Sequence, residues 1–437
     1  MHVKPQLADY QVIPSIMKVG AKTQIQIRPL GAHAAFGEAV YAVQFLPMNE
    51  SREPAFDYDT MDVAVSDDGC LRFSYTFSGE QMYIVRLFRM DDVTVEGVRK
   101  YGKSRKMMDF HVYALREDLY ALRPYRGDLH VHSACSDGRE APEIVAANYR
   151  KKGFDFFALT DHHLYEPSVQ CKAYYADKPI DLEIIKGEEV HPAGNHIHMV
   201  HVGGEKSVNT LVRDDPAMYQ AEVAALMESL AIPDGVNAFE YASCVWSFGK
   251  MREFGGMAIY PHPHWTSDVY HTPDAMSEAL FRAKVFDAFE LLGGNEPSEN
   301  NLQVAFYQNM AAKGYRMPVV GSSDSHGTER DWLFGWLTSI VFAESAAAED
   351  VMAAVKAYRS VAVEAYPNET VRVYGDYRLV MYAQFLLEEY FPLHDELCFE
   401  EGRLMKEMFL GDKKAEALLR LMKGRTDILR QSYWGVI

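Results

Sequence analysis

Hydrophobic and polar positions follow three different patterns along the 437-residue chain. In the first part, short alternating or aromatic-rich runs at 24–28, 41–45 and 82–88 lie between turn residues, which is typical of strands. From Tyr125 onward, short apolar runs alternate with amphipathic stretches, and this alternation predicts βα units in a parallel sheet or barrel. After residue 367, apolar residues recur at three- and four-residue spacing, which predicts helices.

These patterns predict a β-sandwich-like accessory domain over 1–120, an α/β domain over 121–366 and a helical C-terminal extension over 367–437. In the α/β domain, a helix is expected to begin at Pro142 and to end at Gly153. The long stretch 209–255 is expected to form a helical lid or side wall. The apolar runs place the strands of this domain near 127–131, 154–159, 182–186, 197–202, 257–260, 286–292, 317–321 and 337–342.

Composition narrows the class of protein. No run approaches the roughly 20 apolar residues of a membrane helix, and the first residues lack the apolar core of a secretory signal, so we expect a cytoplasmic protein without a membrane partner. The five cysteines contain no CxxC pair, which argues against a disulfide framework or a zinc ribbon. A net charge of −18 opposes binding to duplex nucleic acid. A small anionic substrate is still possible, because a bound metal ion can make a cleft locally cationic while the rest of the surface stays acidic.

Histidine is the informative residue type, because 12 of the 16 histidines lie between His130 and His326. On the first strand of the α/β domain, His130 and His132 alternate onto one side, and Asp137 in the following turn can approach them as an oxygen ligand. The end of a barrel strand is the usual place for an active site. Similar groups of His, Asp and Glu follow or occupy later strands, at 160–163, 187–191, 196–201, 260–264 and 321–327.

Six strand ends with such side chains would be costly to bury unless metal ions coordinated them.

The segments YRGDLHVHSACSDG, ALTDHH, GEEVH, HIHMV, YPHPH and GSSDSHG resemble, in this order, the motifs of the PHP (polymerase and histidinol phosphatase) family. The resemblance spans about residues 125–365. It implies a distorted (β/α)7 barrel that holds two or three divalent ions, and the imidazole-rich ligand set suits zinc, manganese or iron.

The resemblance also implies a ligand set of nine residues. One ion would be held by His130, His132, Glu189 and Asp324, and Glu189 would bridge to a second ion on His198 and His262. A third ion would be held by Asp137, His162 and His326. Glu188 is the alternative to Glu189, and His196 and His201 are the alternatives to His198.

The expected activity is that of a metal-dependent phosphoesterase, which hydrolyses the phosphate ester of a small molecule or nucleotide through a metal-activated hydroxide. The candidates for protonating the leaving oxygen are His201, His264 and a metal-bound water. Arg139 and Arg330, in loops after metal motifs, are the candidates for binding the phosphate. His163, His191 and His264, next to ligand positions, could touch substrate, but a role in supporting the ligands or a place on the surface is expected.

Two other functions fit parts of the pattern. An amidohydrolase-like hydrolase also begins with an HxH motif and ends with an aspartate, but it would not need all nine ligands. A non-catalytic metal-binding module would be expected to have lost ligands, whereas each of the nine positions carries a residue type that binds metal. The sequence does not predict the particular substrate or the oligomeric state.

Overall fold

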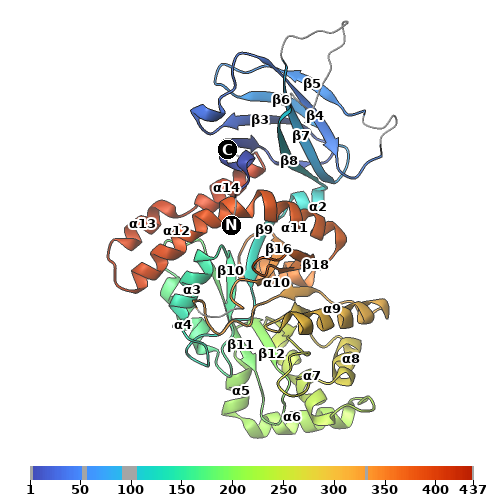
Figure 1. Ribbon diagram of the computed structural model, residues 1–437. Helices are drawn as coiled ribbons and strands as arrows, with labels where there is room; N and C mark the ends of the chain where they lie inside the picture. Colours follow the sequence, from blue (N-terminus) through green and yellow to red (C-terminus); the bar gives the residue numbers. More distant parts are fainter. Residues whose placement is uncertain (1–2, 52–56, 91–105, 330–332, 436–437) are drawn as a thin grey trace. The chain divides into compact units, whose positions relative to one another are not determined.

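The computed structural model describes residues 3–51, 57–90, 106–329 and 333–435 (Figure 1). The chain divides into two compact units. The first unit contains Met1–Leu122, Met381–Glu396 and Gly424–Ile437, and the second contains Arg123–Val380 and Leu397–Lys423. The helical residues predicted after 367 are therefore shared between the units, and the three predicted domain ranges stay a prediction.

The first unit is built on two sheets. One has the strand order β1–β3–β6 and the other the order β2–β8–β7–β4–β5. Buried side chains of both sheets, such as Ile25 and Phe73 on one and Phe45 and Val85 on the other, belong to the same apolar core. The strands are β1 (Tyr10–Ile13), β2 (Ile16–Lys18), β3 (Lys22–Pro29), β4 (Val40–Pro47), β5 (Thr60–Val63), β6 (Leu71–Thr76), β7 (Gln81–Met90) and β8 (Lys106–Leu115).

The second unit is a mixed α/β structure with one ten-stranded sheet, in the order β15–β14–β13–β12–β11–β10–β9–β16–β17–β18. Its first eight strands lie at the predicted apolar runs, with shifts of a few residues at their ends. They are β9 (Arg123–Asp128), β10 (Phe156–Leu159), β11 (Glu183–Val190), β12 (Met199–Gly203), β13 (Gly256–Tyr260), β14 (Ala288–Leu292), β15 (Val319–Gly321) and β16 (Leu337–Ala343), followed by β17 (Ser360–Glu364) and β18 (Arg372–Tyr374).

The expectation of a parallel sheet was wrong for part of this unit. β12 runs antiparallel to both β11 and β13, and β16 runs antiparallel to β9 and β17. The chain has only residues 191–198 between β11 and β12. A parallel crossover needs about a dozen residues or more, so this short connection brings β12 back in the opposite direction.

The sheet is curled. β15 is the first strand in the order, and β16 and β17 lie near its other end. The Ser360 hydroxyl of β17 nevertheless donates to the Val319 carbonyl of β15 at 2.7 Å, and the Gly321 amide of β15 donates to Ser339 Oγ of β16 at 3.0 Å. β15 therefore lies beside β16 and β17, although it is far from them in the sheet order. Inside the curl, Ile185 and Ile259 share an apolar cluster with Val351 of α10 (Ala348–Lys356).

Helices surround this sheet in the second unit (Figure 1). The predicted helix from Pro142 is confirmed as α3 (Pro142–Lys151), and Gly153 follows it with a left-handed φ of 97°. The predicted helical stretch 209–255 contains three helices that share one apolar cluster with β13 and β14; the third of them packs against β13, and the second packs against the third. The helices not yet named are α1 (Pro5–Asp9), η1 (Ala32–Ala34), α2 (Glu117–Tyr120), α4 (Glu166–Tyr175), α5 (Val208–Asp214), α6 (Pro216–Ser229), α7 (Ala238–Glu253), α8 (Asp274–Ala283), α9 (Pro297–Ala312), α11 (Tyr377–Glu389), α12 (Phe391–Phe409), α13 (Ala415–Met422) and α14 (Arg425–Tyr433).

Among the described residues, no helix combines the length and the apolar character needed to cross a membrane.

Candidate metal centre

The first two predicted ligands lie just beyond a strand rather than within it. β9 ends at Asp128, but the backbone continues extended because Val131 forms a parallel bridge with Ser325. The His132 amide donates to the Ser325 carbonyl at 3.0 Å, and the Asp324 amide donates to the His130 carbonyl at 3.0 Å. Both imidazoles are fully buried and face the same side, as the alternation predicted.

His130 and His132 converge on two carboxylates. His130 Nε2 lies 3.3 Å from Glu189 Oε2 and 3.3 Å from Asp324 Oδ1. His132 Nε2 lies 3.3 Å and 2.9 Å from the same two oxygens. The four side chains form one group whose donor atoms all lie within 4.8 Å of one another, close enough to hold a single metal ion.

The second carboxylate oxygen of Glu189 faces a different pair of imidazoles. His198 Nδ1 lies 2.8 Å from Glu189 Oε1, and His262 Nε2 lies 3.5 Å from it. These three residues form a second group that could hold an ion. One carboxylate thus serves two groups through its two oxygens, which is the arrangement of a bridging ligand.

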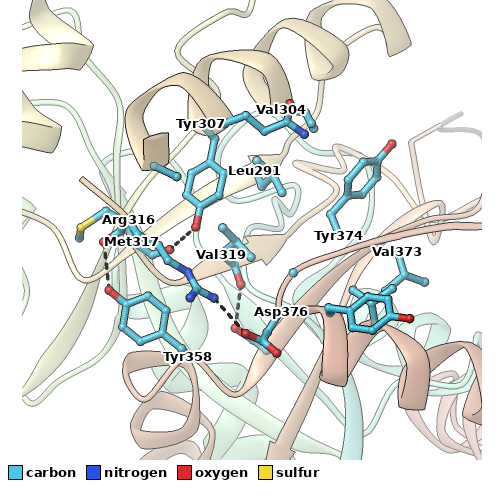
Figure 2. Close-up of a pocket in the computed structure, with 16 residues that line it drawn as sticks. Leu291, Val304, Tyr307, Arg316, Met317, Val319, Tyr358, Val373, Tyr374 and Asp376 are labelled. Atoms are coloured by element: carbon cyan, nitrogen blue, oxygen red, sulfur yellow. Dashed lines mark hydrogen bonds and ion pairs between the residues drawn. The ribbon is translucent and has the colours of Figure 1, made fainter. Parts of the chain in front are cut away.

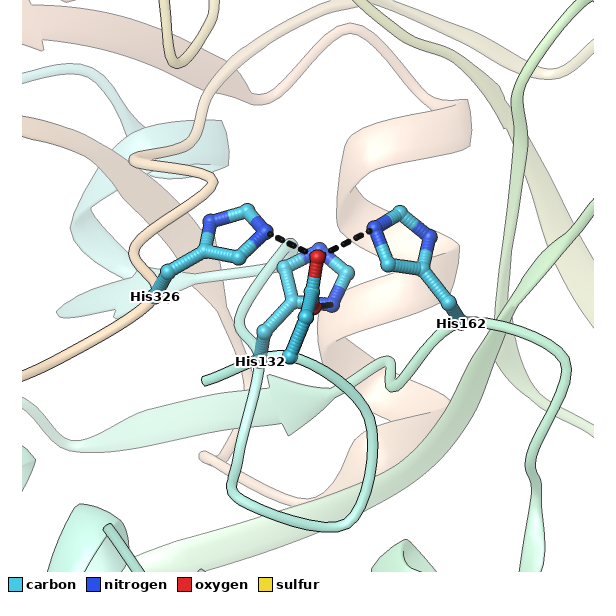
Figure 3. Close-up of side chains that lie close together, drawn as sticks. His132, His162 and His326 are labelled. Atoms are coloured by element: carbon cyan, nitrogen blue, oxygen red, sulfur yellow. Dashed lines mark ion pairs between the residues drawn. The ribbon is translucent and has the colours of Figure 1, made fainter. Parts of the chain in front are cut away.

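A third group surrounds Asp137. Asp137 Oδ2 lies 3.5 Å from His162 Nε2 and 3.3 Å from His326 Nε2, and Figure 3 shows these two rings on opposite sides of the carboxylate. His132 completes the group with Nδ1, which is 4.0 Å from Asp137 Oδ1. The structure therefore brings all nine predicted ligand residues into three adjacent groups.

Burial leaves many polar atoms of these groups without a hydrogen-bond partner. In the part of the chain that the structure describes, they include both nitrogens of His132, both oxygens of Glu189 and both nitrogens of His262, together with His130 Nε2 and Asp324 Oδ1. Buried polar atoms are normally paired, and each unpaired one costs about 1–3 kcal/mol. This donor set, made of imidazole nitrogens and carboxylate oxygens, fits divalent transition metals.

The carboxylates give the centre a negative potential. Burial alone would lower the pKa of His132, but its contacts with Asp324 and Glu189 raise that pKa to about 9. Burial alone would also lower the pKa of His130. The nearby carboxylates of Asp324, Glu189 and Glu290 raise this pKa well above its ordinary value. A potential that attracts a proton to these imidazoles also attracts a divalent cation.

Glu290 is a residue of the candidate centre that the sequence reasoning missed. It is fully buried on β14, and its Oε2 lies 3.0 Å from His130 Nδ1. A proton held on Nδ1 by this carboxylate leaves Nε2, the nitrogen facing Glu189 and Asp324, free to bind a metal. The available signal was a single acid in the otherwise apolar strand AFELL.

Two further acids hold the loops that carry the ligands. Asp128 accepts hydrogen bonds from the His130 and Ser323 amides and from the Tyr149 hydroxyl, while burial raises its pKa to about 7. Asp161 accepts from the Ser133 amide at 2.8 Å and from the Ser136 hydroxyl at 2.6 Å. Asp161 therefore fixes the turn that presents Asp137.

The structure separates the adjacent acids Glu188 and Glu189. Glu188 accepts from the Ser207 hydroxyl and the Val208 amide, both at 2.6 Å, at the start of α5. His201, its partner in the β11–β12 register, lies 3.0 Å from it through Nδ1. Since successive strand residues face opposite sides, Glu188 and His201 point away from the face of Glu189. His201, a candidate for protonating the leaving oxygen, and Glu188, the alternative to Glu189, therefore do not face the three ligand groups.

The other predicted residues have mixed outcomes. His264 is not in any of the three groups, and it lies 3.5 Å from Asp274 and packs beside Tyr270, so its predicted catalytic role finds no support in these contacts. His196 is exposed and lies 3.0 Å from Glu240. Arg139 is exposed in the loop that carries Asp137, and Arg330 lies outside the described residues.

Two histidines outside the predicted ligand set also reach the centre. His191 Nε2 lies 3.2 Å from His162 Nδ1 and 3.5 Å from Glu189 Oε1. His191 therefore contacts two of the predicted ligands directly. The ring of His271, which the sequence reasoning did not single out, lies 4.2 Å from that of His198. Burial and the neighbouring imidazoles lower the pKa of His271 to about 2, so its ring is neutral.

A cavity of about 480 Å³ lies elsewhere in the second unit (Figure 2). Its lining contains the Arg316 and Asp376 ion pair at 3.4 Å, and the Tyr358 hydroxyl donates to the Arg316 carbonyl. None of the nine ligand residues lines it. This cavity is therefore separate from the candidate centre.

Comparisons with known proteins give distant likenesses. No family model matches the chain. An uncharacterized protein of Methanocaldococcus jannaschii is 24% identical over 150 residues, which cover 32% of this chain and 68% of that protein. A solved two-domain structure from Bacteroides vulgatus, described as containing a predicted PHP-like metal-dependent phosphoesterase, is 18% identical with a TM-score of 0.40, over 55% of this chain and 65% of that one.

An amidohydrolase from Chromobacterium violaceum, solved with bound sulfate and no metal, is 19% identical with a TM-score of 0.33, over 47% of this chain and 89% of that one. The candidate metal centre is defined by the clustered imidazoles and carboxylates of this chain.

Proposed function

We propose that this protein is a metal-dependent phosphoesterase of the PHP type, which hydrolyses the phosphate ester of a small molecule or nucleotide. The observation that supports it best is the convergence of buried imidazole nitrogens and carboxylate oxygens that have no hydrogen-bond partner among the described residues. Burial without partners would be destabilising, whereas coordination of cations satisfies these atoms.

In this proposal the three groups hold two or three divalent ions, with zinc, manganese or iron as the candidates. His130, His132 and Asp324 hold the first ion, His198 and His262 hold the second, and Glu189 belongs to both through its separate oxygens. The third ion belongs to the exposed group of Asp137, His162 and His326. The curled sheet is proposed to be the distorted (β/α)7 barrel that the motifs imply.

Bound divalent ions in such an array lower the pKa of bound water and neutralise charge on a phosphoryl group. The protein's own part is to hold the ligands in one geometry. Glu290 orients His130, and Asp161 fixes the turn of Asp137. The buried Glu189 and Asp324 supply the negative charge that retains cations. No protein nucleophile is required.

The test combines elemental analysis of the purified protein with assays on phosphomonoesters, phosphodiesters and amides. His132→Ala is the test variant, and His196→Ala is the matched control because His196 is an exposed histidine outside the centre. We expect metal and phosphatase activity in the wild type and in His196→Ala, and loss of both in His132→Ala. Equal activity in wild type and His132→Ala would show that the proposed site is wrong.

The same panel separates the alternatives. Cleavage of amides without cleavage of phosphate esters would indicate an amidohydrolase-like enzyme. Stoichiometric metal without hydrolysis of any ester or amide would indicate a non-catalytic metal-binding module.

A further inference from the structure

An aromatic loop borders the proposed centre. It connects β13, through the ligand His262, to α8, and three of its large apolar side chains are exposed to solvent. Trp265 is 38% exposed, Tyr270 45% and Val269 74%. Large exposed apolar groups gathered on one loop are typical of a binding surface.

The loop is held in place by its own hydrogen bonds. The Trp265 amide donates to the His262 carbonyl at 3.1 Å, and the His271 amide donates to the Trp265 carbonyl at 2.7 Å. The Thr266 amide donates to Glu299 of α9 at 3.0 Å, and Thr266 also bridges to Tyr270. The backbone that carries the indole is therefore held in place before any ligand binds, which reduces the entropic cost of binding.

The indole of Trp265 lies directly beside the second group of proposed ligands. Its ring centroid is 6.1 Å from that of His198 and 6.2 Å from that of His262. The His271 ring, 5.3 Å away, lies beside the same indole. An ester phosphate held by His198 and His262 through metal would therefore lie close to this ring.

We infer that Trp265 is a specificity-determining residue whose indole stacks on a planar aromatic part of the phosphate ester. This inference rests on the proposed function. The metal ions would hold the charged phosphate, and the exposed indole offers the remaining organic part an apolar, flat surface. Stacking on an aromatic side chain favours planar rings over saturated groups of similar size.

The test compares 2-naphthyl phosphate with cyclohexylmethyl phosphate in the wild type, Trp265→Ala and Trp265→Phe. Differences in leaving-group reactivity cancel when each variant is divided by the wild type for the same ester. We expect Trp265→Ala to lose about tenfold or more in kcat/KM for the naphthyl ester, mainly through KM, and less than about twofold for the saturated ester. Trp265→Phe should retain most of the naphthyl preference, and Leu418→Ala, at an exposed apolar residue of α13, should leave kcat/KM for both esters unchanged.

Two further measurements make the outcome decisive. Metal content must be equal in all variants, and the affinity for a non-hydrolysable naphthylmethyl phosphonate is measured by calorimetry. Unchanged activity in Trp265→Ala, or equal losses for both esters, would overturn the inference. If the wild type hydrolyses no ester, the proposed function fails, and the phosphonate still decides on Trp265: tenfold weaker binding to Trp265→Ala supports it, and equal or absent binding overturns it.

Discussion

Replacing Glu189 by glutamine, with Glu188→Gln as the control, tests the assignment of the bridging ligand within one strand. Both acids are fully buried and adjacent in the sequence, and the two substitutions are chemically identical. They differ in the face of β11 on which each side chain lies. Glu189 faces six imidazoles, whereas Glu188 faces the start of α5 and His201.

The two substitutions should change different quantities, metal affinity in Glu189→Gln and the free energy of unfolding in Glu188→Gln. Glu189→Gln removes a charge shared by two groups of ligands, so metal affinity should fall by more than the roughly 100-fold typical of supporting residues. Glu188→Gln should leave metal binding nearly intact. It replaces a carboxylate that accepts hydrogen bonds from the Ser207 hydroxyl and the Val208 and Asn209 amides by a group with one accepting oxygen, at a cost of about 2–4 kcal/mol in the free energy of unfolding.

Metal affinity is measured by competition with a chromogenic chelator, and stability by urea unfolding in excess chelator, so that metal does not contribute. Loss of metal in Glu189→Gln together with loss of stability in Glu188→Gln is the expected pattern. If Glu188→Gln lost metal and Glu189→Gln retained it, the assignment of the two faces, and with it the bridging role, would be refuted.

Other predictions follow from the same contacts. Glu290→Gln should weaken metal binding about 10- to 100-fold while leaving the fold intact by circular dichroism; unchanged affinity would show that Glu290 does not orient His130. Removal of metal by a chelator should abolish activity and lower the melting temperature, both restored by added ion, and activity that survives full metal removal would contradict the proposal. Arg150→Met breaks a buried pair with Glu401 at 2.7 Å and should cost about 3–5 kcal/mol in urea unfolding, whereas Arg403→Met, in a solvent-exposed pair, should change the free energy of unfolding little; similar losses would contradict this.

Apolar runs were enough to predict the first eight strands of the second unit but not β17 and β18, and the family resemblance of the motifs named the nine residues that gather at its centre. The direction of β12 was not predictable in the same way, because an apolar run such as MVHV reads equally well in either direction. The faces of Glu188 and Glu189 depend on the pairing of β11 with β12, and a shift of one residue exchanges them.

Other features depend on contacts between distant segments. Glu290 is 160 residues from His130 in the sequence, so nothing local indicates that the two side chains meet. Trp265 and His271 lie in a loop whose hydrogen bonds, rather than any periodic pattern, bring their rings to the centre. The division of the C-terminal helices between two units likewise follows from packing that a helical pattern alone does not specify.

The position of His132 has a consequence for how the centre fills. Its ring offers one nitrogen to the buried group and the other to the group of Asp137, but a neutral imidazole has a free lone pair on only one nitrogen. A neutral His132 bound to the first ion leaves the third position with Asp137, His162 and His326. The Asp137 side chain is 56% exposed, whereas His132 is fully buried. In the proposed centre, a third ion would therefore exchange most readily at this solvent-facing end, and its occupancy in a purified sample would follow the metal content of the surrounding medium.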